Sequence, residues 1–390
     1  MNSRERMLTV IRGGQPDYVP MAFMIFSALR AKHDDWFGRI EAQAELGLDA
    51  VADATSLMPR EPTGHRDAPG VPIRFGPGVS VRQWKERPAG ARYPLLHKQY
   101  ETPDGTLSVA VHQTDDWPYG DQVPLLDDFL VPRCTKYLVT EEDDLPALRR
   151  LLGAPDEEDA RKCRDLWRRG KEFAHRRGVL FTAGWGVGAD ALGWLCGLQN
   201  AVLLAVDEPE FLGALLDVIS DWNRARTELM LEAGPDLLMR RAWYEGTAYW
   251  SPPLFRRFLL PRIAAEVKLA HEAGAAYGYI MSVGGLQFAP LLREAGIDVL
   301  VGVDPVQDTG MDMAALKAAS GGKFALWGGV NGFLTVERGT RREIRRAVRE
   351  ALDALGPSGL ILSPVDNVRD ASDGVWRNVL ALIEAWREMR

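Results

Sequence analysis

The sequence predicts an α/β protein whose strands close into a (β/α)8 barrel, the TIM-barrel architecture. Short apolar runs recur along the 390 residues, and most of them precede longer stretches with helical spacing of apolar residues. Such alternation indicates a parallel sheet, and eight units in one chain favour a closed barrel over an open doubly wound sheet. The glycine fingerprint of dinucleotide-binding open sheets is also missing, because "GWGVGADALG" lacks the G-x-G-x-x-G spacing.

Each expected strand is a short run rich in apolar residues. In chain order the runs are "YVPMAFMI" (18–25), "LDAVADA" (48–54), "GVLFTAG" (178–184), "DLLMRRA" (236–242), "AYGYIMS" (276–282), "IDVLVGV" (297–303), "KFALWGG" (323–329) and "GLILSPV" (359–365). Amphipathic stretches between them, such as "TRREIRRAVREALDALG", end in glycine, as helices often do.

One region, from about residue 70 to residue 140, breaks this rhythm. Its sequence alternates between apolar and polar residues, and "TPDGT" (102–106) is a strong hairpin turn. We therefore expect a β-hairpin insertion in an early loop of the barrel, which could cover the mouth or form a homodimer contact. No linker rich in Ser, Gly or Pro separates it, so residues 1–390 are expected to form a single domain.

Composition excludes several classes of protein. The net charge of −7 argues against nucleic-acid binding, which usually needs a basic face. No segment approaches the roughly 18 apolar residues of a membrane span, and the N-terminus lacks the apolar core of a signal peptide, so a cytoplasmic location is expected. The three cysteines form no C-x-x-C pair and the six histidines are scattered, which indicates neither a disulfide framework nor a zinc site.

Active sites of barrels lie at the carboxyl ends of the strands, and this rule selects the candidate residues. They are Trp185 after the third strand, Arg241, Trp243, Tyr244 and Glu245 after the fourth, Ser282 after the fifth, Asp304 after the sixth, Asn331 after the seventh, and Asp366 and Asn367 after the eighth. We interpret the three carboxylates as catalytic candidates and the other residues as substrate-binding candidates.

The carboxylates also have structural explanations. Glu245 lies among aromatic residues in "RRAWYEGTAYW", where an unpaired carboxylate is costly, and this favours a role in the site. Trp243 could instead seal the top of the barrel. Asp366 follows the last strand directly, in a loop that could merely cap the final helix, and Asp304 could simply hold its turn.

Several motifs taken together resemble the uroporphyrinogen decarboxylase superfamily. They are "RERMLTVIRGGQPDYVP" near the N-terminus, "SPPLFRRFLLPRIAAEVKLAHEAGAAYGYIMSVGG" in the middle, and "LWGGVN" and "LILSPVDNVRDASDGVWRNVLALIEAWRE" towards the C-terminus. The resemblance covers nearly the whole chain apart from the insertion, and it independently implies a (β/α)8 barrel.

The true decarboxylases of this superfamily carry an arginine-rich turn of the form RQAGR after the first strand. The matching stretch here is "IFSAL" (25–29), which has no arginine to clamp the carboxylates of a porphyrinogen. The family's late histidine, in a GHG setting, is matched by Asp366. The resemblance therefore argues against decarboxylation of uroporphyrinogen.

The other branch holds corrinoid-linked methyltransferases, whose zinc-bearing members use an H-x-C-G turn after the fifth strand and a cysteine after the seventh. The matching positions are Met281, Val283 and Asn331, so zinc is doubtful and no metal ligand is assigned. The turn "MSVGG" (281–285) keeps the glycines, because the backbone must still turn sharply there.

The leading hypothesis is a methyltransferase-like enzyme that moves a methyl group from a small O- or N-methyl donor to a corrinoid on a partner protein or to a folate. Glu245 would be the acid or the residue that orients the substrate, with Trp185, Trp243 and Tyr244 as stacking walls. Two alternatives stay open. One is a decarboxylase or lyase for a small carboxylate bound by Arg241 or Arg369, with Arg30 as a weaker candidate. The other is a catalytically inactive, ligand-binding barrel.

Overall fold

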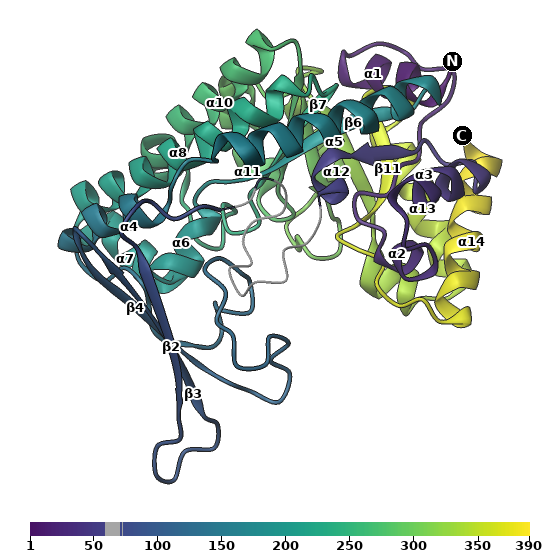
Figure 1. The fold of residues 1–390 in the computed structure, drawn as a ribbon. Coiled ribbons are helices and arrows are strands. Elements are labelled where there is room, and N and C mark those ends of the chain that lie inside the picture. The colour runs from purple at the N-terminus through teal and green to yellow at the C-terminus, as the bar shows by residue number, and fades with distance from the viewer. Residues whose placement is uncertain (59–70, 72) are drawn as a thin grey trace. The chain divides into compact units, whose positions relative to one another are not determined.

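The computed structural model describes residues 1–58, 71 and 73–390 (Figure 1). The chain divides into two compact units. The barrel unit comprises Met1–Leu57, Leu166–Gly184 and Leu231–Arg390, and the insertion unit comprises Met58–Asp165 and Trp185–Met230. Residues 70 and 72, at the start of the predicted insertion, lie outside the described residues.

A parallel sheet of seven strands forms the centre of the barrel unit. In spatial order its strands are β1 (Val51–Asp53), β6 (Leu180–Val187), β7 (Leu237–Arg241), β8 (Ala276–Ile280), β9 (Val299–Val303), β10 (Ala325–Asn331) and β11 (Leu360–Val365). The spatial order equals the chain order, and helices separate most of the strands, so the predicted barrel class is confirmed.

The first expected strand, residues 18–25, is reduced to a single parallel bridge between Met21 and Leu362 of β11. Leu362 N donates to Pro20 O over 2.8 Å, and Ala22 N donates to Leu362 O over 3.0 Å. On the other side Asp49 N, just before β1, donates to Met21 O over 2.8 Å. This segment therefore joins the last strand to the first and closes the ring, while Pro20 has no N–H with which to lengthen the ladder.

Helices follow most of the strands and cover the sheet of the barrel unit (Figure 1). Those with residues in the barrel unit are α1 (Ser3–Ile11), α2 (Ser27–Lys32), α3 (Trp36–Glu45), α5 (Glu157–Arg176), α8 (Pro209–Glu232), α9 (Pro252–Leu254), α10 (Leu260–Glu272), α11 (Gly285–Ala295), α12 (Met313–Ser320), α13 (Arg341–Leu355) and α14 (Asp373–Met389). Short helical turns lie at η1 (Ala54–Leu57), η3 (Phe255–Leu259) and η4 (Gly332–Glu337).

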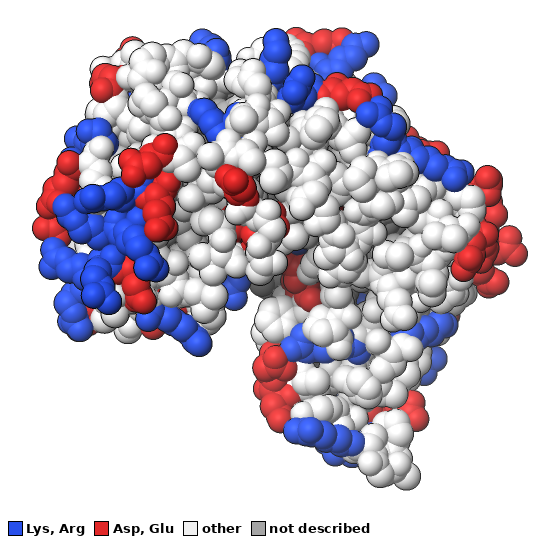
Figure 2. Space-filling model, turned by 180° about the vertical axis from the view of Figure 1, so that it is seen from behind, with Lys and Arg blue, Asp and Glu red and all other residues white. Residues whose placement is uncertain are grey.

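Helix α13 shows how sequence periodicity places a helix on the barrel. It buries Ile344, Val348, Ala351 and Leu355, which lie on one face at helical spacing. Its opposite face is rich in arginine, and Arg341 and Arg345 pair with the acidic Glu384 and Glu388 of α14. Figure 2 shows blue and red side chains interleaved on the surface of the molecule.

The predicted β insertion is an antiparallel sheet of four strands. Its strands are β2 (Ser80–Glu86), β3 (Leu95–Thr102), β4 (Gly105–His112) and β5 (Cys134–Lys136), in that spatial order. The predicted turn is confirmed, because Thr102 pairs with Gly105 across a two-residue loop. Further elements of the insertion unit are η2 (Glu142–Asp144), α4 (Leu145–Leu151), α6 (Asp190–Leu195) and α7 (Leu198–Asp207).

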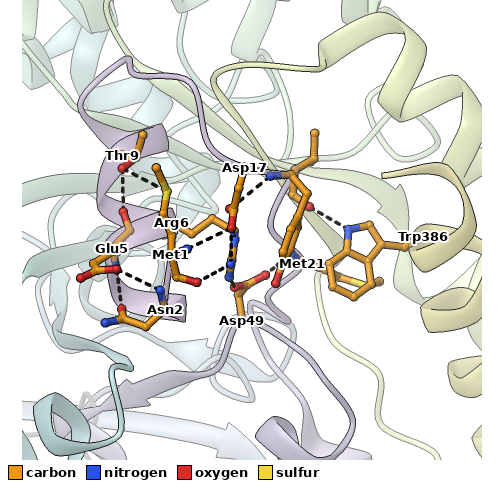
Figure 3. Close-up of polar contacts among 11 residues, drawn as sticks. Met1, Asn2, Glu5, Arg6, Thr9, Asp17, Met21, Asp49 and Trp386 are labelled. Atoms are coloured by element: carbon orange, nitrogen blue, oxygen red, sulfur yellow. Dashed lines mark hydrogen bonds and ion pairs between the residues drawn. The ribbon is translucent and has the colours of Figure 1, made fainter.

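Aspartates tie together the amino-terminal rim of the barrel. Asp49, before β1, accepts hydrogen bonds from Met21 N over 3.1 Å and from the guanidinium of Arg6 in α1 over 2.6 Å. Arg6 also donates to Asp17 over 2.5 Å (Figure 3), and its guanidinium lies 3.7 Å from the ring centre of Tyr18. The N-terminal motif that carries the family resemblance therefore builds this network.

Two further aspartates repeat the pattern at other strands. Asp236, before β7, accepts from Phe181 N over 3.0 Å and contacts His175 Nε2 at 3.2 Å. Asp298, before β9, accepts from Tyr277 N over 2.7 Å and contacts His271 Nε2 at 2.7 Å. In each case the carboxylate joins the start of the preceding strand to the helix that leads into it.

No helix within the described part of the chain is both long and apolar enough to cross a membrane.

Candidate active site at the carboxyl-terminal rim

The loop after β7 is anchored by a buried ion pair. Arg240 of β7 lies opposite Tyr279 of β8 in the strand register, and both side chains reach Glu245. Arg240 Nη2 donates to Glu245 Oε1 over 2.6 Å, and the Tyr279 hydroxyl donates to Oε2 of the same carboxylate. Glu245 is 0% exposed, so this predicted catalytic candidate lies inside the structure and is paired with an arginine.

The network continues to helix α10. Glu266 of that helix accepts from Arg240 Nη1 over 3.1 Å and from the Tyr277 hydroxyl over 2.8 Å. Because Glu266 belongs to a helix outside the sheet, these side chains lie between the sheet and its helices. Successive residues of a strand point to opposite faces, so Arg241 points the other way, towards the barrel interior.

Burial and charge together set the protonation of this network. Burial raises the pKa of Tyr277 and Tyr279 well above the ordinary value, and the nearby carboxylates raise it further, so both phenols stay protonated as donors. Burial alone would lower the pKa of Arg240, but the charges of Glu245 and Glu266 outweigh it and raise the pKa. Arg240 therefore remains a cation between two carboxylates.

Aromatic side chains line the same loop. The Arg241 guanidinium lies 4.7 Å from the ring centre of Trp243. Trp250 is 4% exposed and its Nε1 donates to Tyr244 O over 3.0 Å, so Trp250 seals the loop. Trp243 and Tyr244 remain partly exposed, as a stacking wall requires.

The turn after β8 packs directly on the loop after β7. Gly284 has a φ of 91°, and a Cβ there would lie 2.8 Å from Thr247 Cγ2. A Cβ at Gly246 would lie 2.5 Å from Val283 O. Only glycine fits these contacts, which explains why the turn keeps its glycines. Ser282 is buried in this turn, at 6% exposure.

Asp304 and Asn331 are brought into contact at the ends of β9 and β10. Asp304 Oδ1 accepts from Val306 N and Gln307 N over 2.9 and 3.1 Å, and Oδ2 accepts from Asn331 Nδ2 over 2.7 Å. Asp304 is 0% exposed. Burial raises its pKa above the ordinary value, although the hydrogen bonds oppose that shift.

The loop after β11 contacts the first βα loop. Asn367 Oδ1 accepts from Ser27 N over 3.1 Å, and Asn367 Nδ2 donates to Ser27 Oγ over 3.0 Å. Asp366 lies nearer the surface, where its Oδ2 is 3.5 Å from Arg369 Nη2. Trp185 has a φ of 67°, which is uncommon for a residue with a side chain, and it belongs to the insertion unit.

The structure thus unites the candidates only in part. It joins Asp304 to Asn331, while Glu245 and Asp366 each pair with a separate arginine. The sequence reasoning overlooked Arg240, Tyr277, Tyr279 and Glu266. The spacing of "AYGYI" could have indicated that Tyr277 and Tyr279 lie together, since residues two apart share one face of a strand.

The family's zinc positions do not fit zinc in this chain. Met281 offers a buried thioether, and Val283 has no donor atom. Asn331 Oδ1 already accepts from Leu334 N over 2.6 Å, and its Nδ2 donates to Asp304. Zinc prefers thiolate, imidazole and carboxylate ligands, so these residues form no zinc site. Across residues 1–58, 71 and 73–390 no group of three or more His, Cys, Asp or Glu is arranged to hold a metal ion.

The part of the chain that builds most of this barrel and its carboxyl-terminal rim also matches a family model. The model for uroporphyrinogen decarboxylase (URO-D) matches residues 180–388, which is more than half of the chain. The chain belongs to this family, as the sequence motifs predicted. No curated protein matches it.

A solved structure shows the same fold, and a second is similar over most of its length. A methyltransferase from Methanosarcina mazei is 16% identical, with a TM-score of 0.59 over 100% of this chain and 99% of that one. A B12-independent methionine synthase from Shewanella sp. W3-18-1 is 10% identical, with a TM-score of 0.47 over 95% of this chain and 97% of that one. At 16% identity, the likeness to the methyltransferase concerns the fold alone.

Proposed function

We propose that this protein is a methyltransferase-like enzyme that takes a methyl group from a small O- or N-methyl donor. The acceptor would be a corrinoid carried by a partner protein, or a folate. Within the family, the missing arginine clamp in "IFSAL" supports this choice over porphyrinogen decarboxylation. The similarity of the fold to that of a methyltransferase is compatible with it.

The observation that carries the proposal is the pairing of Asp304 with Asn331. Asp304 is a buried carboxyl group with a raised pKa, held at the rim by three N–H donors. A carboxyl group with a raised pKa is suited to general acid catalysis. When the methyl group leaves the donor for the acceptor, the remaining oxygen or nitrogen would take the proton from Asp304.

The other rim residues receive supporting roles. Trp243 and Tyr244, both partly exposed, would stack on the donor or on a cationic methylammonium group. Arg241, Ser282 and Asn367 would orient the donor. Glu245 would act as a positioning residue for the loop, because its carboxylate is paired with Arg240 and Tyr279 on the side of the sheet that faces the helices. Asp366, in the loop after β11, would be a further acidic group at the rim that the donor could contact.

A second candidate is a catalytically inactive barrel that binds a ligand. The pairing of Glu245 with Arg240 and of Asp366 with Arg369 favours it, because such pairs can serve structure alone. The decarboxylase or lyase alternative is supported by the alternation along β7, which directs Arg241 to the face opposite Arg240, where it could hold a small carboxylate.

The test is a methyl-transfer assay with purified protein. The protein is incubated with reduced corrinoid, or with a folate, and a panel of O- and N-methyl donors, and the methylated acceptor is quantified. We expect transfer from at least one donor, and a large loss with Asp304→Asn but not with the surface substitution Glu294→Gln. Folded protein that methylates neither acceptor across the panel would support the inactive barrel. Release of carbon dioxide from a small acid, lost in Arg241→Ala, would support the lyase.

A further inference from the structure

Among the strands that the structure describes, β2 of the insertion unit lies at the long edge of its sheet. The sheet order is β2-β3-β4-β5, so β2 is hydrogen-bonded to β3 alone among the described strands. It runs for seven residues, whereas the opposite edge, β5, has three. A long exposed edge presents unpaired N–H and C=O groups to which another strand can add, and proteins usually keep such edges short or covered.

One face of β2 is already occupied within its own unit. Gln83 Nε2 donates to Gln122 Oε1 over 2.8 Å, and Val123 N donates to Gln83 Oε1 over 2.9 Å. Lys85 Nζ lies 3.0 Å from Asp121 Oδ1 on the same face. A partner that adds to this edge must therefore match the other face.

The other face carries Arg82, Trp84 and Glu86, which alternate along the strand. The Trp84 ring stacks on His97 of β3, with centres 4.9 Å apart and planes 3° apart. The Arg82 guanidinium lies 5.2 Å from the Trp84 ring centre, and Glu86 Oε2 lies 3.3 Å from His97 Nε2. A central aromatic residue is thus flanked by a cation on one side and an anion on the other.

This pattern is complementary to itself when two copies meet in antiparallel orientation. With the two-fold axis at Trp84, Arg82 of each copy faces Glu86 of the other, and the two Trp84 side chains face each other. Directly opposed cross-strand residues have Cβ atoms about 4.5–5.5 Å apart, within reach of an ion pair. An axis at Lys85 would oppose two lysines, and an axis at Gln83 would leave Arg82 opposite Trp84.

We propose that β2 pairs with β2 of a second copy of this chain, so that the two four-stranded sheets join into one sheet of eight strands with the two-fold axis at Trp84. The pairing is independent of the methyl-transfer proposal. A seven-residue edge buries less surface than a standard interface, so the dimer dissociates on dilution. Its two ion pairs are exposed and therefore weaken with added salt.

The proposal is tested by reversing the charges of Arg82 and Glu86 and measuring dimerisation. Full-length protein is examined by sedimentation from about 1 µM to about 1 mM, the range in which a small interface dissociates. We expect a reversible dimer. Arg82→Glu and Glu86→Arg should each weaken dimerisation at least about tenfold, because each opposes like charges twice. The double substitution Arg82→Glu with Glu86→Arg should restore it, since opposite charges again face each other.

Mixing the two single variants gives the sharpest outcome. In a heterodimer every opposed pair has opposite charges, so the mixture should dimerise although neither variant does alone. Arg92→Glu in the exposed β2–β3 connection makes the same charge change outside the strand and should have no effect. Circular dichroism verifies that each variant is folded. A wild-type monomer at every concentration, a dimer indifferent to the single substitutions, or a mixture that stays monomeric would each overturn the proposal.

Discussion

Arg240 of β7 and Tyr279 of β8 lie opposite each other in the parallel register, and both donate hydrogen bonds to the carboxylate of Glu245. Glu245 follows β7 in sequence but turns back to the side of the sheet that carries Tyr279. The loop after β7 is therefore fixed to both strands by the side chain of Glu245. Its aromatic residues owe their position to an ion pair that solvent does not reach.

Removing one partner of this pair should destabilise the protein strongly. In Glu245→Ala, the buried Arg240 cation loses its shortest contact, and breaking a buried pair typically costs about 3–5 kcal/mol. The free energy of unfolding, measured in urea, should fall accordingly. Glu294→Gln, which breaks an exposed pair with Arg256, should change it little. Unchanged stability in Glu245→Ala, accompanied by lost activity, would instead make Glu245 a catalytic group.

Asp304 and Asn331 should show strong coupling in a double-mutant cycle. In Asp304→Asn the new amide can still accept from Val306 N and Gln307 N, but its NH2 group then faces the NH2 group of Asn331. Such a buried conflict costs about 1–3 kcal/mol. Asn331→Asp opposes two carboxylates. The double substitution exchanges donor and acceptor, so its loss of stability should be smaller than the sum of the two single losses. Additive losses would refute the contact.

The raised pKa of Asp304 also predicts a pH dependence. A carboxyl group whose pKa is higher in the folded than in the unfolded protein binds its proton more tightly when folded. Its contribution to stability is therefore greatest at low pH and is lost as pH rises from the unfolded pKa of about 3.9 through the folded pKa. Asn331→Asp should steepen this loss, because the two facing carboxyl groups then share a proton. Urea unfolding midpoints measured across this pH range would check both the sign and the steepening.

Asp236 should have the opposite pH dependence at the amino-terminal rim. Burial would raise its pKa, but the hydrogen bond from Arg4 and other contacts outweigh burial and lower it. Its stabilising contribution is therefore present above the unfolded pKa of about 3.9 and is lost as pH falls through the lower folded pKa. Asp236→Asn should reduce stability near neutral pH and flatten the acid limb of the curve. The exposed Asp221→Asn is the matched control, and equal curves for the two variants would contradict this role.

Purified protein should carry no stoichiometric zinc at the turn after β8. Met281 and Val283 provide no thiolate or imidazole, and the polar atoms of Asn331 are already bonded. Elemental analysis after dialysis without chelator measures the zinc content directly. One zinc per chain that disappears on substitution of Glu245 would show that acidic residues had replaced the family ligands.

The sequence predicted the barrel because its main signal, short apolar runs between amphipathic stretches, reflects burial on a repeating geometry. Seven runs became strands, whereas residues 18–25 formed only the bridge at Met21. Apolar composition does not reveal that a proline limits the hydrogen-bonded ladder. The turn at Thr102–Thr106 was predictable because local chemistry decides it.

The candidate site was less predictable. Position at a strand end correctly placed Asp304 and Asn331 at one rim, but it could not reveal which face of the sheet Glu245 would reach. That choice depends on Arg240, Tyr279 and Glu266, which come from three separate elements. The functional roles of the site residues, and a single domain spanning residues 1–390, stay predictions.

The aspartates of the amino-terminal rim suggest how such a barrel can change its chemistry. Asp49, Asp236 and Asp298 each clamp a strand start to a neighbouring helix, at the rim opposite the candidate site. Substitutions in the loops of the carboxyl-terminal rim leave these contacts untouched. Residues of the carboxyl-terminal rim can therefore change without loss of the contacts that hold the strand starts to their helices, so the stability of the scaffold and the chemistry of the site depend on different ends of the barrel.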